Sequence, residues 1–79
     1  MLDNLTGLVV FAKVVEEGGF SKAANSLGIS KSSVSKQVSA LEDHLGTRLL
    51  NRTTRRFSLT ESGTLLYERC QRIVAEVDA

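Results

Sequence analysis

Serine and lysine side chains gather on one side of the helix predicted over residues 30–46. On a helical wheel they face away from the apolar residues; they are Ser32, Ser35, Lys36 and Ser39, with Lys31 near the helix start. This face becomes acidic only further along, at Glu42 and Asp43. A helix that enters a groove lined by phosphates and base edges needs small hydroxyl donors together with positive charge. The pattern therefore favours contact with a nucleic acid over a face that is merely solvated.

A second basic stretch follows this helix. Residues 51–56 contain three arginines and two threonines, with the apolar runs 49–50 and 57–59 on either side. These runs predict the two strands of a β-hairpin with the basic stretch as its tip. Such a tip can lie against a nucleic-acid backbone or reach into a minor groove. The alternative is that its charges guard an exposed strand edge against aggregation.

The charge of the whole chain conceals this concentration, because the 79 residues sum to only +1. Seven basic and two acidic residues give the segment 20–58 a charge of +5, while the segments before and after it are each −2. A basic middle between acidic flanks is typical of a protein with a polyanion partner. Taken alone it is weak support, since solvated faces also carry runs of charge.

Two helices are predicted ahead of the serine–lysine helix. Asp3 or Asn4 can cap the first one, and Gly18-Gly19 can end it. Its expected buried stripe consists of Leu5, Leu8, Val9, Ala12 and Val15, widened by Phe11 and Val14. The second helix is short, with Ser21 as its expected N-cap and Gly28 as its end.

The turn after this short helix has the features of a helix-turn-helix. Gly28 can adopt a positive φ at little cost, Ile29 is expected to fill the corner, and Ser30 can cap the third helix. An apolar stripe at helical period follows, at Val34, Val38, Leu41 and Leu45. Close approach of two helices at such a turn requires small residues, here Ala23 and Ala24. Only the first two turns, 31–36, are expected to read a ligand, and the helix from Leu41 onward is expected to serve as scaffold.

The last predicted helix has Thr60 as its cap and Glu61 in its first turn, where the helix dipole favours a carboxylate. A coiled-coil-like seam of three- and four-residue spacings runs along it, at Gly63, Leu66, Cys70, Ile73 and Val77. This seam could pair with a second copy of the chain or pack on its own domain. The helical pattern reaches Ala79 without a C-cap glycine, as expected for a segment of a longer protein.

Several classes of protein are excluded by composition. With 42% hydrophobic and 24% charged residues the chain is expected to be globular, with one small core. It lacks an apolar run of the ~20 residues that span a bilayer. Its single cysteine, Cys70, is expected to be a small buried thiol rather than a redox sensor. No nucleophile or metal-ligand cluster accompanies His44 in sequence, so we expect no catalytic residues and no metal site. Because a membrane-length apolar run is missing, we expect a cytoplasmic protein without a cofactor.

Taken together, these residues resemble the N-terminal DNA-binding domain of a LysR-type transcriptional regulator over nearly the whole chain. The resemblance is carried by Phe11, Val14, Val15, Glu16, Gly18, Phe20, Ser21, Ala23, Ala24, Leu27, Ile29, Ser30, Ser33, Val34, Ser35, Gln37, Leu41, Glu42, Leu45, Gly46, Leu49, Arg52, Arg55, Leu59, Thr60 and Gly63. Two positions depart from it. Leu50 stands where the family often has phenylalanine, and Lys36 stands where arginine is frequent, which removes a bidentate fork.

The resemblance implies a mostly α fold: a winged helix-turn-helix over residues 1–59, with three helices and a two-stranded wing, followed by a long linker helix over 60–79. It implies sequence-specific binding of double-stranded operator DNA by a homodimer that pairs through the last helix. The effector-binding domain is absent from this chain, so a small-molecule effector would bind only the full-length protein. No membrane partner is expected.

The family's contacts carry over to individual residues. Helix 31–45 would enter the major groove, with the wing 51–56 on the backbone or in the minor groove. Base-reading residues would be Lys31, Ser32, Ser35, Lys36 and Arg55; backbone contacts would come from Ser21, Ser30, Ser33, Arg52 and Thr54; dimerisation would use Leu66, Cys70, Ile73 and Val77. Helix capping is the alternative role for Ser21, Ser30 and Ser33. A different class also stays open, a protein-interaction module that uses the last helix while the rest is scaffold.

Overall fold

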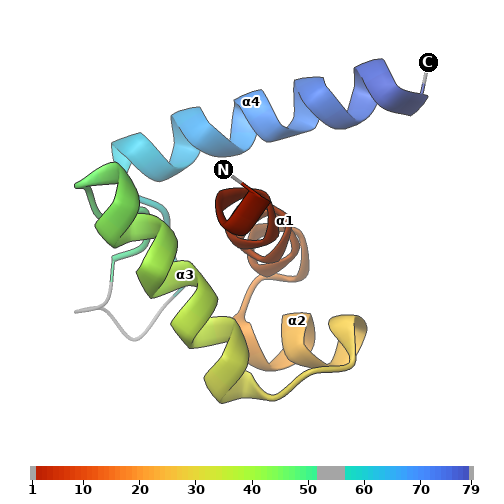
Figure 1. Cartoon of the computed structure of the whole chain (residues 1–79), viewed down its shortest axis with the longest axis vertical. Helices are drawn as coiled ribbons and strands as arrows, with labels where there is room; N and C mark the ends of the chain where they lie inside the picture. Colours follow the sequence, from red (N-terminus) through yellow and green to blue (C-terminus); the bar gives the residue numbers. More distant parts are fainter. Residues whose placement is uncertain (1, 52–56, 79) are drawn as a thin grey trace. The chain divides into compact units, whose positions relative to one another are not determined.

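The computed structural model describes the backbone of residues 2–51 and 57–78 and the side chains of residues 5–51 and 57–73. In these residues the chain is mostly helical (Figure 1), with α1 Leu2–Glu17, α2 Phe20–Leu27, α3 Lys31–Leu45 and α4 Glu61–Asp78. It divides into two compact units, Met1–Thr47 and Arg48–Ala79. None of these helices is long and apolar enough to cross a membrane. The expected functional boundary between residues 59 and 60 stays a prediction.

The first unit is built from three helices that all contact one another, α1 with α2 and α3, and α2 with α3. Its buried apolar core consists of Val10, Phe11, Val14, Ala23, Ala24, Val34, Val38 and Leu41. Ala23 and Ala24 are small enough for α2 to approach its neighbours closely, as predicted. The largest fully buried side chain is Phe11, so α1 provides the centre of this core.

The predicted buried stripe of α1 is wrong in part. Leu5 is 56% exposed and Val9 is 55% exposed, whereas Phe11 and Val14 are fully buried. Residues 8–12 are all apolar, so every side of the helix in that region is apolar. Periodicity cannot single out one face of such a helix, and packing against α2 and α3 determines which face is buried.

Two predicted helix caps are also wrong. Helix α1 begins at Leu2, so Asp3 and Asn4 lie inside its first turn. Helix α2 begins one residue before the predicted cap Ser21, because the amide of Ala23 already donates to the carbonyl of Gly19 at 3.2 Å. Gly19 is the N-cap of α2 and offers no side-chain hydrogen bond.

The turn between α2 and α3 has the predicted geometry at its glycine and its serine. Gly28 ends α2 with φ 71°, and its amide and that of Ile29 both donate to the carbonyl of Ala24. This left-handed residue is strained for side chains other than glycine. Ser30 then adopts an extended backbone and accepts from the amide of Ser33 at 3.1 Å. Ile29 is 41% exposed, so the prediction that it fills the corner is wrong.

The apolar stripe of α3 is buried over most of its length. Val34, Val38 and Leu41 are buried, whereas Leu45, near the helix end, is 46% exposed. Glu42 was placed on the outer face by the sequence, yet it is only 4% exposed. It follows Val38 by four residues and so lies at the edge of the buried stripe rather than opposite it. Among the described residues no buried side-chain nitrogen or oxygen lacks a hydrogen-bond partner.

The second unit is held by pairing between the segments on either side of the basic stretch. Leu50 and Leu59 form an isolated antiparallel bridge, and the amide of Asn51 donates to the carbonyl of Ser58 at 3.1 Å. The two predicted strands are reduced to this bridge in the part that the structure describes, and residues 52–56 lie outside it. Thr60 caps α4 as predicted, since its Oγ1 accepts from the amide of Gly63 at 3.0 Å.

Gly63 makes the closest backbone approach in this unit. A Cβ built on Gly63 would collide with the carbonyl oxygen of Leu49 and would lie 3.0 Å from its carbonyl carbon. Both of these atoms are backbone and cannot rotate away. At the seam position of Gly63, α4 therefore packs directly against the main chain of Leu49 in the same unit.

Replacing Gly63 with alanine tests this close approach, because the sign of the change in the free energy of unfolding depends on it. In an ordinary helix interior, glycine to alanine stabilises by about 1 kcal/mol. Here we expect Gly63→Ala to lower the free energy of unfolding by roughly 1–3 kcal/mol, because the added methyl group overpacks against Leu49. Urea denaturation monitored by circular dichroism measures the change. A stabilised Gly63→Ala protein would contradict the packing described.

Candidate nucleic-acid interface

The outer face of α3 brings together four of the five residues predicted to read DNA bases. Lys31, Ser32 and Lys36 are exposed, and Ser35 is half-buried. Positions 35 and 36 lie three and four residues after position 32, so both share one side of the helix with it. The burial of Val34 and Val38 turns that side away from the core of the first unit. The result is a narrow strip with two ammonium groups and small hydroxyls.

Among the described side chains of the first unit, no ion pair neutralises the positive charge of this strip. Lys13 pairs with Glu16 at 3.8 Å, whereas over the side chains described for residues 5–47 no ion-pair partner is found for Lys31 or Lys36. Flexible, unpaired ammonium groups on a convex helix face can approach phosphates and base acceptors.

The serines at the start of α3 form a small network of their own. Ser30 Oγ accepts from the amide of Ser33 and donates to Ser33 Oγ at 3.0 Å. The capping role considered for Ser30 is thus observed. Ser33 is exposed, and its hydroxyl retains a proton that it can donate. Ser21 is exposed in the first turn of α2. The predicted backbone contacts of these three serines stay predictions.

The wing residues named from the sequence lie outside the described residues; they are Arg52, Thr54 and Arg55. The structure instead reveals a bonding role for a residue at the base of this stretch that the sequence counted only as part of the wing 51–56. Asn51 donates from Nδ2 to Ser58 Oγ at 3.1 Å and to the carbonyl of Leu59 at 3.2 Å. The signal available in the sequence was weak: an asparagine at the end of an apolar run, where its side chain can bond to backbone.

The predicted dimerisation residues of α4 differ in exposure. Cys70 is 8% exposed, Leu66 is half-buried and Ile73 is 57% exposed, while the side chain of Val77 is not described. Burial raises the pKa of the Cys70 thiol, so thiolate forms less readily than in free cysteine. This agrees with the predicted buried thiol. The exposed Ile73 leaves apolar surface on α4 that could meet a partner.

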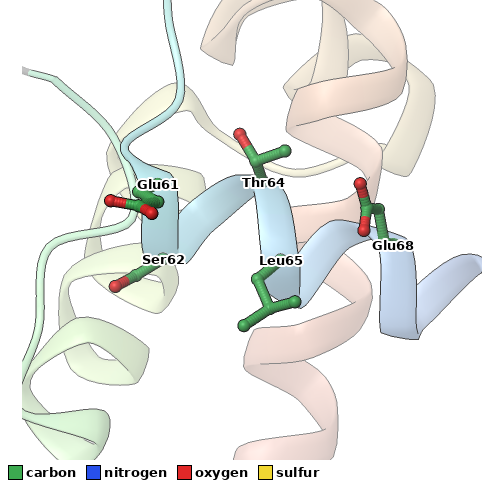
Figure 2. A pocket seen from close by; sticks show the side chains of 5 residues that line it. All are labelled: Glu61, Ser62, Thr64, Leu65 and Glu68. Atoms are coloured by element: carbon green, nitrogen blue, oxygen red, sulfur yellow. The ribbon is translucent and has the colours of Figure 1, made fainter.

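A shallow hollow lies along the first turns of α4 (Figure 2). It is lined by Glu61, Ser62, Thr64, Leu65 and Glu68. Two carboxylates flank a leucine that is 53% exposed, which is unfavourable for a phosphate and suits a protein surface better. Within the described residues, no group of three or more His, Cys, Asp or Glu side chains could hold a metal ion.

A three-helix unit with this turn and an outer serine–lysine face defines the chain as a helix-turn-helix protein. The family model for the bacterial regulatory helix-turn-helix proteins of the lysR family matches residues 5–64. The chain belongs to this family. The resemblance inferred from the residues is confirmed, and the family's members reported below are transcriptional regulators rather than enzymes.

Similar proteins support this assignment over nearly the whole chain. An HTH-type transcriptional regulator of Xanthomonas campestris pv. campestris is 53% identical over 78 residues, which cover 99% of this chain and 23% of that protein. CrgA of Neisseria meningitidis is 51% identical over 79 residues, 100% of this chain and 26% of that protein. The chain therefore spans about a quarter of the length of these relatives.

Solved structures agree in fold. The BenM_DBD chain in a complex with catB site 1 DNA has a TM-score of 0.86 and is 38% identical, with 94% of this chain and 82% of that chain covered. The structure of CrgA, a LysR-type transcriptional regulator, has a TM-score of 0.74 and is 51% identical, with 92% and 25% covered. The chain is thus a LysR-type helix-turn-helix domain of a transcriptional regulator.

Substitutions of Ser30 and Ser32 distinguish a serine that stabilises α3 from one that is predicted to contact DNA. Ser30→Ala removes the side-chain cap and should lower the free energy of unfolding by about 1 kcal/mol. Ser32→Ala alters an exposed hydroxyl for which no hydrogen bond is found among the described residues, and it should change that free energy by less than about 0.5 kcal/mol. Chemical denaturation of both variants measures the difference. If both variants lose the same free energy of unfolding, the hydrogen bond of the Ser30 cap does not stabilise α3.

Proposed function

We propose that this chain is a cytoplasmic, sequence-specific binding domain for double-stranded DNA that acts as a homodimer. The observation that carries the proposal is the exposed strip of Lys31, Ser32, Ser35 and Lys36 on α3. Among the described side chains of its unit no ion-pair partner is found for its two lysines, and its opposite side is buried. In the full-length protein a small-molecule effector would bind beyond this chain.

Helix α3 is the proposed recognition helix. Its first two turns carry the strip, and an α-helix fits the width of the major groove of B-DNA. Lysine can donate to the N7 and O6 acceptors of guanine, while serine hydroxyls can donate or accept at either base of a pair. BenM_DBD, 38% identical to this chain, was solved in a complex with DNA, which supports a similar use of this fold.

The basic stretch after α3 is proposed as the second contact. Arg55 would reach into the minor groove, with Arg52 and Thr54 nearer the phosphates, and Ser21, Ser30 and Ser33 would add backbone contacts around α3. The pairing of Asn51 with Ser58 closes the base of this stretch as a hairpin would. Arginine is well suited to the narrow, negatively charged minor groove.

Dimerisation is proposed through α4, with Leu66, Cys70, Ile73 and Val77 as the seam. Support comes from the seam residue Ile73, which is 57% exposed. Large apolar side chains left on one helix are best covered by another helix. Two domains joined in this way would present two recognition helices to a pair of half-sites.

Substitution of the recognition helix should change sequence preference. Lys36→Ala removes a donor aimed at base edges, and we expect a loss of roughly 1–3 kcal/mol in binding that differs between operator sequences. Fluorescence anisotropy with a panel of duplexes measures this. If Lys36→Ala binds every duplex as tightly as the wild type, the base-reading role of this face is wrong.

Substitution of the wing should act on the salt dependence. Arg55→Ala or Arg52→Ala is expected to weaken binding more evenly across sequences. Each variant should also reduce the slope of log K against log salt by about 1 for every phosphate that the protein no longer neutralises. Titrations at several salt concentrations give the slope. An unchanged slope would remove the phosphate assignment.

The α4 surface could instead make the whole chain a protein-interaction module. The exposed Leu65 between Glu61 and Glu68 is the feature that favours this function (Figure 2). Titration with random duplex DNA at low salt discriminates the two functions, because phosphate contacts alone produce non-specific binding at micromolar protein. Absence of any binding under those conditions would favour the interaction module.

A further inference from the structure

We propose that Asn51 and Thr60 are positioning residues for DNA binding, which join the described residues on either side of the segment 52–56 to one another and to the first turn of α4. The proposal rests on the DNA-binding function above and adds two residues to it. Neither residue needs to touch DNA. They would act indirectly, by fixing the positions of Asn51 and Phe57, the residues that flank the basic stretch.

Asn51 joins the two sides of this junction with three hydrogen bonds. Its amide donates to the carbonyl of Ser58, and its Nδ2 donates to Ser58 Oγ at 3.1 Å and to the carbonyl of Leu59 at 3.2 Å. Backbone pairing alone would leave a short bridge at Leu50 and Leu59. A two-residue bridge is marginal in water, so the side-chain bonds of Asn51 add substantially to its closure.

Thr60 joins the same junction to α4. Its Oγ1 donates to the carbonyl of Arg48 at 2.6 Å and accepts from the amide of Gly63 at 3.0 Å. Its own amide donates to the carbonyl of Leu49 at 3.0 Å. One threonine therefore caps the helix and also holds the segment that leads into the basic stretch.

The close backbone approach at Gly63 leaves no space between α4 and the segment before the basic stretch. With no side chain at Gly63, the carbonyl of Leu49 lies directly against the first turns of α4. The start of α4 and the residues before the basic stretch therefore cannot shift independently. Arginines held between fixed chain ends lose less conformational entropy on meeting phosphates than arginines on a free loop.

The test uses duplex binding by the whole chain at several salt concentrations. Asn51→Ala and Thr60→Val should each weaken binding about tenfold and make the salt slope shallower by about one to two, because the protein then neutralises fewer phosphates. Thr60→Ser retains the hydroxyl and should restore both values. Thr64→Ala is the matched control, since it removes only the Thr64 Oγ1 bond to the carbonyl of Thr60 within the same helix. It should bind like the wild type.

Circular dichroism and amide exchange of Asn51→Ala keep the proposal testable if Thr60→Val does not fold. Asn51 is exposed, so Asn51→Ala leaves no cavity and should keep its helical circular dichroism even if Thr60→Val is too unstable to assay. Amide exchange at Thr60 should speed up in Asn51→Ala if the junction loosens. Wild-type binding and salt slope in Asn51→Ala would overturn the proposal. Failure of the wild-type chain to bind any duplex would overturn the proposed function itself.

Discussion

Burial of Val34, Val38 and Leu41 is the constraint on which the candidate interface depends. These side chains lie in the core formed with α1 and α2, and they fix how α3 is rotated about its own axis. Rotation by a third of a turn would bury Lys36 and expose valine. Because burial of each such apolar side chain contributes about 1.5–3 kcal/mol, that alternative is strongly disfavoured. The hydrophobic core thereby determines which side chains can meet a groove.

The boundaries of α3 are as important as its rotation. Ser30 satisfies an amide of the first turn and Gly46 ends the helix in the left-handed conformation, with φ 70°. The residues proposed to read DNA occupy the turns directly after the cap, where the helix dipole adds to the charge of Lys31 and Lys36. The second unit uses the same chemistry at Thr60, where one hydroxyl caps α4 and holds a neighbouring segment. Local capping bonds therefore set the ends of both candidate contacts.

Most of the helices and the outer face of α3 could be predicted from the sequence, because glycine, serine and threonine act through short-range chemistry at Gly28, Ser30 and Thr60. The buried face of α1 could not, since a helix that is apolar all round has no periodic signal and only its neighbours decide. Glu42 was predicted on the outer face of α3 but is buried, because a position at the edge of the apolar stripe can lie on either face. The role of Asn51 depends on Ser58 and Leu59, which no spacing rule connects to it.

Selection of bound sites from a random duplex pool tests the central claim most directly. A dimer that presents two α3 helices should enrich a pair of related half-sites separated by about 10–10.5 base pairs or a multiple of that distance. The positions of strongest preference should lose their preference when the pool is selected with Lys36→Ala. A pool that stays random while the protein is folded and binds DNA would contradict sequence-specific reading by α3.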